Sequence, residues 1–292
     1  MILETAHPYT VLDVFTDRPL TGNPLAVFTD GERIPTPLMQ ALARELHLSE
    51  TVFLLPGDDQ ADAEVRIFTP ASELPFAGHP VLGAAFVLGA ARSLSEVRLR
   101  TGAGVVPVRL TRDSDRISFG EMEQPLPTRR TFERSSELLE ALGLTASLLP
   151  VEAYTNGPTH VMVAVPTVAE LAVLEPDLTA ITGLGTLCVN CFAASEPLAP
   201  AGASVALRCR VFCPGLGVPE DPATGSAAGP LGWHALRHGW ALSGQDVRIV
   251  QGVEIGRPSV LHARVQGAPD SPGRNTVGGS AVVVAHGHFQ LA

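Results

Sequence analysis

The chain has 292 residues, of which 45% are hydrophobic and 17% charged, so it is long enough for two domains with buried cores. This composition excludes disordered, collagenous and coiled-coil proteins. Acidic residues outnumber basic ones by 30 to 20, which gives a formal charge of −10, and no basic cluster suited to a phosphate backbone is visible. Nucleic acid is therefore not expected as a partner.

All 20 basic residues are arginine, because the sequence contains no lysine. That excludes Schiff-base enzymes, covalently held pyridoxal phosphate and P-loop nucleotide binding. We see neither a secretory signal nor an apolar run of membrane-spanning length, so no membrane is expected as a partner. Four cysteines are too few for a disulfide scaffold, which favours a cytoplasmic protein.

In the first part of the chain, helical periodicity predicts a helix over residues 37–48. A second helix, rich in small residues, is predicted over residues 80–88, with Pro80 at its first position. Short apolar and alternating runs predict the intervening strands. These strands cover residues 9–15, 25–28, 52–55, 64–68, 96–99, 105–110 and 116–119.

Residues 122–131 are polar and contain two prolines, which predicts a linker. We therefore expect two domains, residues 1–124 and 125–292, with the last strand able to return to the first domain. Beyond the linker the order of elements roughly repeats. The predicted helices cover residues 135–142, 168–174 and 226–240, and the strands 151–154, 160–165, 188–193, 206–212, 247–251, 259–265 and 281–284.

Two segments of the chain resemble each other. Each has a glycine, then a polar residue (His79 or Ser226), then a run of small side chains, and the two lie 147 positions apart. Small side chains on a helix are what a closely wrapped sheet demands, because bulky ones would hold the strands away. We expect two sheets, each enclosing one such helix, produced by duplication of one unit.

Glu45 is an acidic residue on the apolar side of the first predicted helix, in the same arc as Leu38 and Leu42. An acid placed there is costly unless it is paired, neutralised or used. Burial raises the pKa of a carboxyl group toward neutrality, which is what a general acid/base needs. The alternative is a glutamate at the edge of the stripe that extends to water or caps a neighbouring loop.

His79 follows Gly78 at the start of the second predicted helix. Free backbone N–H groups at a helix N-terminus favour an anion, and a histidine beside them can donate to a substrate oxygen. The alternative is a histidine that only caps the helix.

Asp221 to Ser226 form the corresponding helix start in the second half, with Gly225 inside it. Hydroxyl and backbone N–H groups there are suited to a carboxylate, whereas the alternative is simple capping by Asp221 or Ser226. Two such helix starts, one in each half, suggest one shared cleft between the domains.

Three other chemistries are weakly supported. Cys188, Cys191, Cys209 and Cys213 have spacings that resemble a zinc site, but both pairs lie in predicted strands, which favours buried core thiols. The serine-hydrolase motif is incomplete around Ser226, and Glu220 interrupts a dinucleotide-binding glycine pattern.

Several long segments, in the right order along nearly the whole chain, resemble the PhzF family of phenazine biosynthesis-like proteins. The matching segments are 13–16, 22–27, 43–51, 66–70, 73–80 and 220–228, with weaker matches at 156–158, 251–252 and 256–259. The resemblance implies an α+β fold like that of diaminopimelate epimerase. In this fold two similar domains each roll a mostly antiparallel sheet around a central helix.

The resemblance also implies roles for individual residues. Glu45 matches the catalytic acid/base of the family, and His79 and Asp221 match residues that support it. Gly78, Gly225 and Ser226 match positions that bind the substrate. It further implies a homodimer and a reaction that needs neither a metal nor an organic cofactor.

We therefore predict an isomerase that moves a proton within a small carboxylate-bearing substrate, similar to trans-2,3-dihydro-3-hydroxyanthranilate isomerase. Racemases of this fold use a cysteine from each half, but here the equivalent positions hold His79 and Ser226. This favours proton transfer by one carboxylate, that of Glu45, over transfer between two thiols. The alternative function is a non-catalytic metabolite-binding or scaffold protein of the same family.

Overall fold

The computed structural model describes residues 5–197 and 202–291, which form two compact units. The first contains the chain up to Met122 together with the segment from Gly279 onward, and the second is Glu123–Gly278. The last strand, β18 (Ala281–Leu291), therefore belongs to the first unit.

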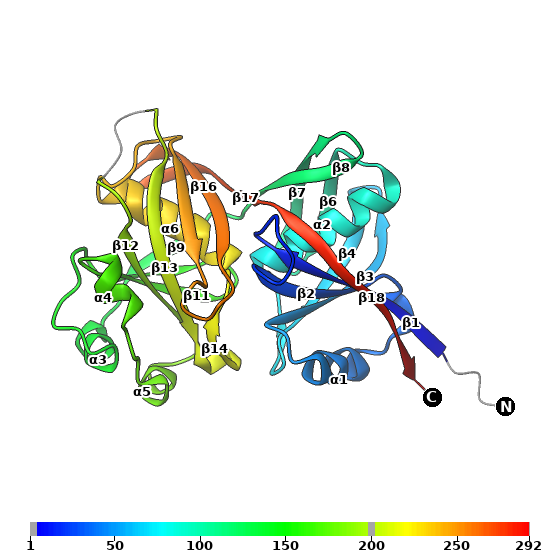
Figure 1. The fold of residues 1–292 in the computed structure, drawn as a ribbon, viewed down its shortest axis with the longest axis horizontal. Coiled ribbons are helices and arrows are strands. Elements are labelled where there is room, and N and C mark those ends of the chain that lie inside the picture. The colour runs from blue at the N-terminus through cyan, green and yellow to red at the C-terminus, as the bar shows by residue number, and fades with distance from the viewer. Residues whose placement is uncertain (1–4, 198–201, 292) are drawn as a thin grey trace. The chain divides into compact units, whose positions relative to one another are not determined.

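The first unit is a sheet with the strand order β18-β1-β2-β3-β4-β6-β7-β8, in which only the β2–β3 and β4–β6 pairs are parallel (Figure 1). The short strand β5 lies on β4. The bounds are β1 Thr5–Val14, β2 Asn23–Phe28, β3 Glu50–Asp58, β4 Ala61–Phe68, β5 Glu73–Leu74, β6 Glu96–Thr101, β7 Gly104–Asp113, β8 Arg116–Glu123, η1 Gly31–Arg33, α1 Thr36–Leu46 and α2 Gly78–Arg92.

Helix α2 is enclosed by this sheet and packs against β1, β2, β3, β4, β6 and β7. Its residues from Gly78 to Phe86 are all buried. A Cβ atom at Gly83 would collide with Leu25 and crowd Val14, and one at Gly89 would collide with Leu110. The small side chains are thus required by the close approach of strands to helix, as the sequence predicts.

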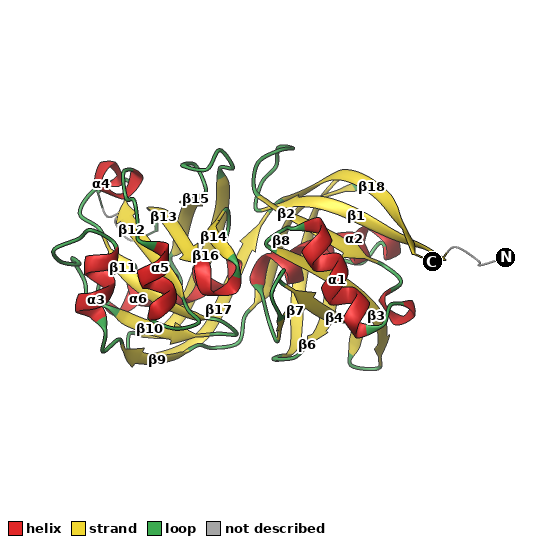
Figure 2. Cartoon of the chain, turned by 90° about the horizontal axis from the view of Figure 1, so that it is seen from below, coloured by secondary structure: helices red, strands yellow, loops and turns green. Residues whose placement is uncertain are grey.

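Helix α1 lies on the outer face of the same sheet, where it packs against β3 and β4 (Figure 2). Its buried residues are Met39, Leu42 and Ala43. They join a cluster that contains the aromatic rings of Phe28, Phe53 and Phe68. This separate cluster decides which side of α1 faces the sheet.

The second unit repeats this topology. Its strand order is β9-β10-β11-β12-β13-β15-β16-β17, again with two parallel pairs, β11–β12 and β13–β15, and the short β14 lies on β13. The strand bounds are β9 Thr128–Thr131, β10 Glu152–Thr155, β11 Thr159–Ala164, β12 Cys188–Ala194, β13 Val205–Cys213, β14 Val218–Asp221, β15 Asp246–Gln251, β16 Ser259–Ala268 and β17 Ser271–Gly279. The helices are α3 Ser135–Ala141, α4 Val168–Ala172, α5 Leu178–Gly183, η2 Pro214–Leu216 and α6 Gly225–Arg237.

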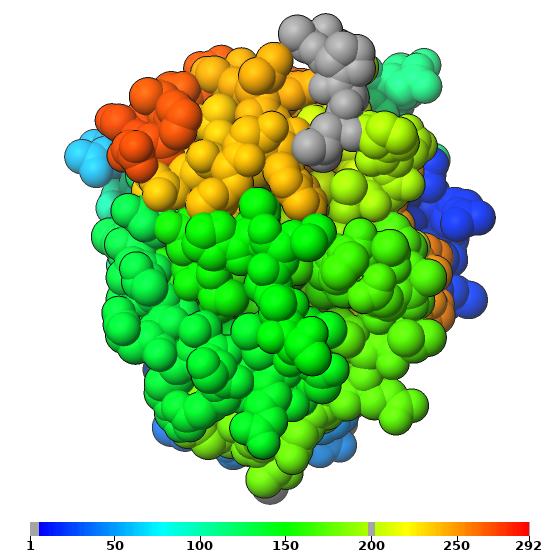
Figure 3. Space-filling model, turned by 90° about the vertical axis from the view of Figure 1, so that its left-hand side faces the viewer, coloured from blue at the N-terminus to red at the C-terminus, as the bar shows by residue number. Residues whose placement is uncertain are grey.

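Helix α6 occupies the position that α2 has in the first unit, and its residues from Gly225 to Leu236 are buried. The segment with α3, α4 and α5 covers the outer side of the unit, where it forms most of the face in Figure 3. These helices contribute Leu138, Leu171 and Ile181 to a core with residues of β11 and β12. The α+β class, with two similar and mostly antiparallel sheets each rolled around a helix, is confirmed.

The structure also corrects several expectations about local structure. Residues 122–131 are not only a linker, because Thr128–Thr131 pair with β10 as strand β9. Strand β17 was not predicted, since its proline and three glycines are typical of loops. The short helix α5 was also missed, and α6 ends at Arg237 rather than at Trp240.

Candidate active site

Glu45 lies in the last turn of α1 and its side chain is exposed. The expectation that it lies within the buried stripe is therefore wrong for this structure. The buried side of α1 is centred on Met39, Leu42 and Ala43, and Glu45 lies outside that arc, about 60° beyond Leu42. The carboxylate of Glu45 is thus in contact with solvent, where a small molecule can reach it.

His79 is the second residue of α2 and is only 2% exposed. Its Nδ1 lies 3.3 Å from Nδ2 of Asn23, and its Nε2 lies 3.4 Å from Oε2 of Glu50. Burial lowers the pKa of His79 to about 3, so the ring is neutral at physiological pH. The helix N-cap is Ala77, which makes no side-chain capping bond, so His79 is not the cap.

Strand pairing explains how these groups meet. Asn23 begins β2, Glu50 begins β3, and the two strands run parallel with Leu25 beside Glu50. Their starts therefore lie together at the N-terminal end of α2, where the first N–H groups of the helix have no partner within the helix. Sequence reasoning did not single out Asn23 or Glu50, although both lie in segments that match the PhzF family.

Asp221 ends β14 and is 7% exposed. It accepts a hydrogen bond from the hydroxyl of Thr224 at 2.6 Å. The amide of Gln251 holds the same turn, because its Nε2 donates to the backbone oxygen of Asp221 at 2.7 Å and its Oε1 accepts from the backbone N of Thr224 at 3.1 Å. The Asp221 carboxylate is thus fixed at the start of α6. Sequence reasoning missed Gln251 beyond noting it in a weaker matching segment.

Ser226 is the second residue of α6, as His79 is of α2, and it is 4% exposed. Its Oγ lies 3.1 Å from Nε2 of His160, and Nδ1 of that histidine lies 3.5 Å from Nδ2 of Asn190. Burial lowers the pKa of His160 to about 3. Sequence reasoning missed His160, because a single histidine in an apolar strand is a weak indication of function.

Gly78 and Gly225 are the first residues of their helices. The N-cap of α6 is Thr224, and like Ala77 it makes no side-chain capping bond. The carbonyl oxygen of Gly225 accepts from Nε2 of Gln124 at 2.7 Å. Both helix starts therefore combine a glycine, a buried polar side chain and a terminus without a side-chain cap, a combination that suits an anionic group of a ligand.

The structure brings Gly78 and His79 together in the first unit, and Asp221, Gly225 and Ser226 together in the second. Glu45 belongs to a different helix of the first unit. Among the described residues, no helix is long and apolar enough to cross a membrane.

The cysteines do not form a four-thiolate metal site. Cys188 and Cys213 face each other across β12 and β13 and are joined by a disulfide, which corrects the expectation of four buried thiols. Cys191 and Cys209 are free and buried. Burial raises the pKa of Cys191 to about 12 and that of Cys209 well above its ordinary value.

Comparison with known proteins agrees with this architecture. A family model described as phenazine biosynthesis-like protein (PhzC-PhzF) matches residues 12–287. The trans-2,3-dihydro-3-hydroxyanthranilate isomerase of Pseudomonas aeruginosa is 46% identical over 285 residues, covering 98% of this chain and 100% of that protein.

Two solved structures resemble the whole fold. A protein of Pseudomonas aeruginosa described as a predicted epimerase has a TM-score of 0.80 and 35% identity, and a PhzF family protein of Bacillus anthracis has a TM-score of 0.84 and 22% identity. In each case 98% of this chain and 100% of the other is covered. At 22% identity, the likeness to the Bacillus anthracis protein shows the fold alone.

The two units, each with a helix enclosed by its sheet, define an epimerase-like α+β protein. Within this class, the chain belongs to the PhzF family of phenazine biosynthesis-like proteins. Because the relatives that match it over their full length are isomerases, it is an enzyme of the isomerase class.

Proposed function

We propose that this chain isomerises trans-2,3-dihydro-3-hydroxyanthranilate. The observation that carries the proposal is the 46% identity, over 98% of this chain, to an enzyme named for that reaction. The exposed carboxylate of Glu45 and the two uncapped helix starts are compatible with a small carboxylate-bearing substrate.

In the proposed reaction, the carboxylate of Glu45 removes a proton from one carbon of the substrate and returns a proton to another carbon. The substrate is neither oxidised nor reduced, so the proposed reaction needs no redox cofactor, and Glu45 alone carries the proton. The N–H groups at Gly78, Gly225 and Ser226 bind the substrate carboxylate. That residues of both units serve one substrate is part of this proposal.

His79 and Asp221 have supporting roles in the proposal. A neutral His79 can donate one hydrogen bond to a substrate oxygen or nitrogen without adding a charge beside Glu50. Asp221, already held by Thr224, can accept a hydrogen bond from a substrate N–H group.

We also propose that the protein is cytoplasmic and that it forms a homodimer. Light scattering on the purified chain tests the homodimer.

Turnover of trans-2,3-dihydro-3-hydroxyanthranilate in D₂O tests the function. We expect conversion by the wild type, and for Glu45→Gln a rate lower by about 10²–10⁴-fold. Glu32→Gln, an exposed glutamate of the same unit, is the matched control and should behave as the wild type. Full turnover by Glu45→Gln would disprove the role of Glu45. Binding of the compound by the wild type without conversion or deuterium incorporation would favour the metabolite-binding alternative.

A further inference from the structure

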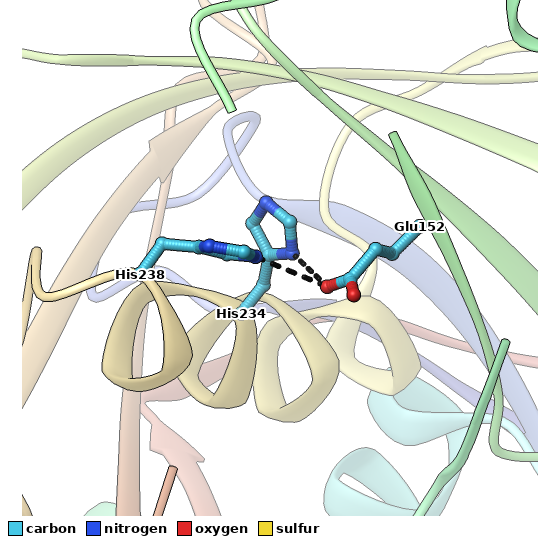
Figure 4. A group of neighbouring side chains, drawn as sticks. All are labelled: Glu152, His234 and His238. Carbon is cyan, nitrogen blue, oxygen red and sulfur yellow. Dashed lines mark hydrogen bonds and ion pairs between the residues drawn. The ribbon is translucent and has the colours of Figure 1, made fainter. Parts of the chain in front are cut away.

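Three potential metal ligands converge in the second unit, away from the helix starts described above. Glu152 begins β10, while His234 lies in the last turns of α6 and His238 is its C-cap. Their ligand atoms all lie within 4.8 Å of one another. Figure 4 shows both imidazole rings turned toward the carboxylate of Glu152.

The helix geometry explains this convergence. Residues four apart on a helix lie on the same face, so His234 and His238 present neighbouring rings. The ring centroids are 4.5 Å apart. His234 lies about 12 Å along the axis of α6 from Ser226, at a rise of about 1.5 Å per residue, so this cluster is not part of the helix start.

Two of the three distances between the donor atoms suit a small metal ion, and the third, between the two histidines, is at most 4.8 Å. Oε2 of Glu152 lies 3.2 Å from Nδ1 of His234 and 3.1 Å from Nε2 of His238. In a tetrahedral zinc site with metal–ligand distances of about 2.0–2.1 Å, neighbouring donor atoms are about 3.3 Å apart. The hydroxyl of Tyr154 lies 2.8 Å from the same oxygen and 3.1 Å from Nδ1 of His234, so it neighbours two of the three donor atoms.

The other carboxylate oxygen of Glu152 is held separately. Nη1 of Arg129 donates to Oε1 at 2.7 Å, and Nη2 of Arg237 lies 3.5 Å from it. These contacts orient the carboxylate and leave Oε2 directed at the histidines, as outer partners of metal ligands do. The two guanidinium charges also oppose a cation, so a site here is weaker than one surrounded by acidic groups.

We propose that Glu152, His234 and His238 bind a divalent transition-metal ion, Zn²⁺ or an ion of similar chemistry. Two imidazoles and one carboxylate are a ligand set that zinc prefers, whereas Mg²⁺ prefers oxygen ligands alone. The bound ion joins β10 to the C-terminal end of α6 and stabilises the second unit. The side chain of His238 is 17% exposed, against 0% for His234, so the ion enters from the side of His238.

The test uses the full chain after removal of metals with a chelator, and Zn²⁺ alone as the probe. Titration calorimetry should show one Zn²⁺ per chain, and the ion should raise the melting temperature where Mg²⁺ does not. Co²⁺ should give the intense visible absorption of a four-coordinate N/O site. These readouts are independent of isomerase activity, so their failure is distinguishable from failure of the proposed function.

Variants separate ligand loss from a general structural effect. His238→Ala should weaken Zn²⁺ binding at least about tenfold. Arg130→Gln changes an exposed arginine of the same strand β9, and it removes neither a ligand atom nor the contact that orients Glu152, so it should retain binding. Circular dichroism confirms that each variant is folded. Absence of stoichiometric Zn²⁺ binding by the wild type, or equal loss in both variants, would show that the cluster is only a hydrogen-bonded network.

Discussion

Nε2 of His160 lies 3.1 Å from Oγ of Ser226, so a buried histidine of β11 contacts the second residue of α6. The first unit makes the corresponding contact with the histidine on the helix instead of the strand, because there His79 of α2 meets Asn23 of β2. In both units the link joins the start of the central helix to the first of two parallel strands. The repeated topology thus preserves the connection while the side chains differ.

Ser226→Ala should destabilise the protein, because it leaves a buried nitrogen of His160 without its partner. The expected loss is about 1–3 kcal/mol in the free energy of unfolding. Urea denaturation followed by circular dichroism measures it, and Ser226→Thr, which keeps a hydroxyl group, serves as the comparison. An effect of Ser226→Ala below about 0.5 kcal/mol, typical of a surface change, would mean that the contact is energetically unimportant.

The stability should fall as the pH is lowered from about 6.5 toward 3. Burial lowers the pKa of His79 and of His160 to about 3, against 6.5 for the unfolded chain, so the unfolded state binds more protons in this range. The contribution is fully present above pH 6.5 and is lost as the pH falls toward 3. Each histidine contributes a slope of about 1.4 kcal/mol per pH unit.

Urea denaturation at several pH values checks this slope. His160→Asn should reduce it by the contribution of one proton, and His79→Asn provides the same measurement in the other unit if the first variant does not fold. His47→Asn changes an exposed histidine with φ of 51°, a conformation that asparagine tolerates, and should leave the slope unchanged. Equal slopes in the wild type and in the buried-site variant that folds would contradict the assignment.

The sequence predicts the positions of the helices better than the contacts at the site. Period and small-residue content place α2 and α6 and identify His79 and Ser226 at their starts. The partners Asn23, Glu50 and His160 were missed because they come from parallel strands, whose register depends on the whole sheet. No local pattern around Glu50 indicates that it meets a histidine 29 positions later.

The orientation of α1 shows a second limit of sequence reasoning. Helical periodicity assigns Glu45 to the apolar arc of Leu38, Ala41, Leu42 and Leu48. In the structure the aromatic cluster of Phe28, Phe53 and Phe68 selects Met39, Leu42 and Ala43 as the buried side. Because that cluster is formed by three strands, the rotation of the helix about its axis depends on tertiary packing.

Gly83→Ala should be strongly destabilising, although alanine is the better helix former. The added Cβ would collide with Leu25 and crowd Val14, so the expected loss is about 1–3 kcal/mol. Gly183→Ala at the end of α5 is the matched control, since nothing lies within 4 Å of its Cβ position. Thermal unfolding of both variants provides the comparison. A Gly83→Ala protein as stable as the control would show that the strands do not pack closely enough on α2 to exclude a methyl group.

The cysteines give a prediction that also concerns the cellular location. In the folded protein, alkylation at pH 8 should modify none of the four cysteines, because Cys188 and Cys213 are bonded and burial raises the pKa of Cys191 to about 12. Unfolding should expose the two thiols of Cys191 and Cys209, and prior reduction should expose four. The disulfide closes a loop across 25 positions, so its reduction should cost about 3.5 kcal/mol of stability in the chain-entropy model.

Mass spectrometry after alkylation counts the thiols in each state, with Cys188→Ser as the control that cannot form the bond. The same count on protein alkylated inside intact cells tests the proposed cytoplasmic location, where disulfides are rare. The cells are lysed and the protein is unfolded with the alkylating reagent still present. Four modified cysteines would then mean that the bond is open in the cell. Two would mean that it persists there, and would count against a reducing compartment.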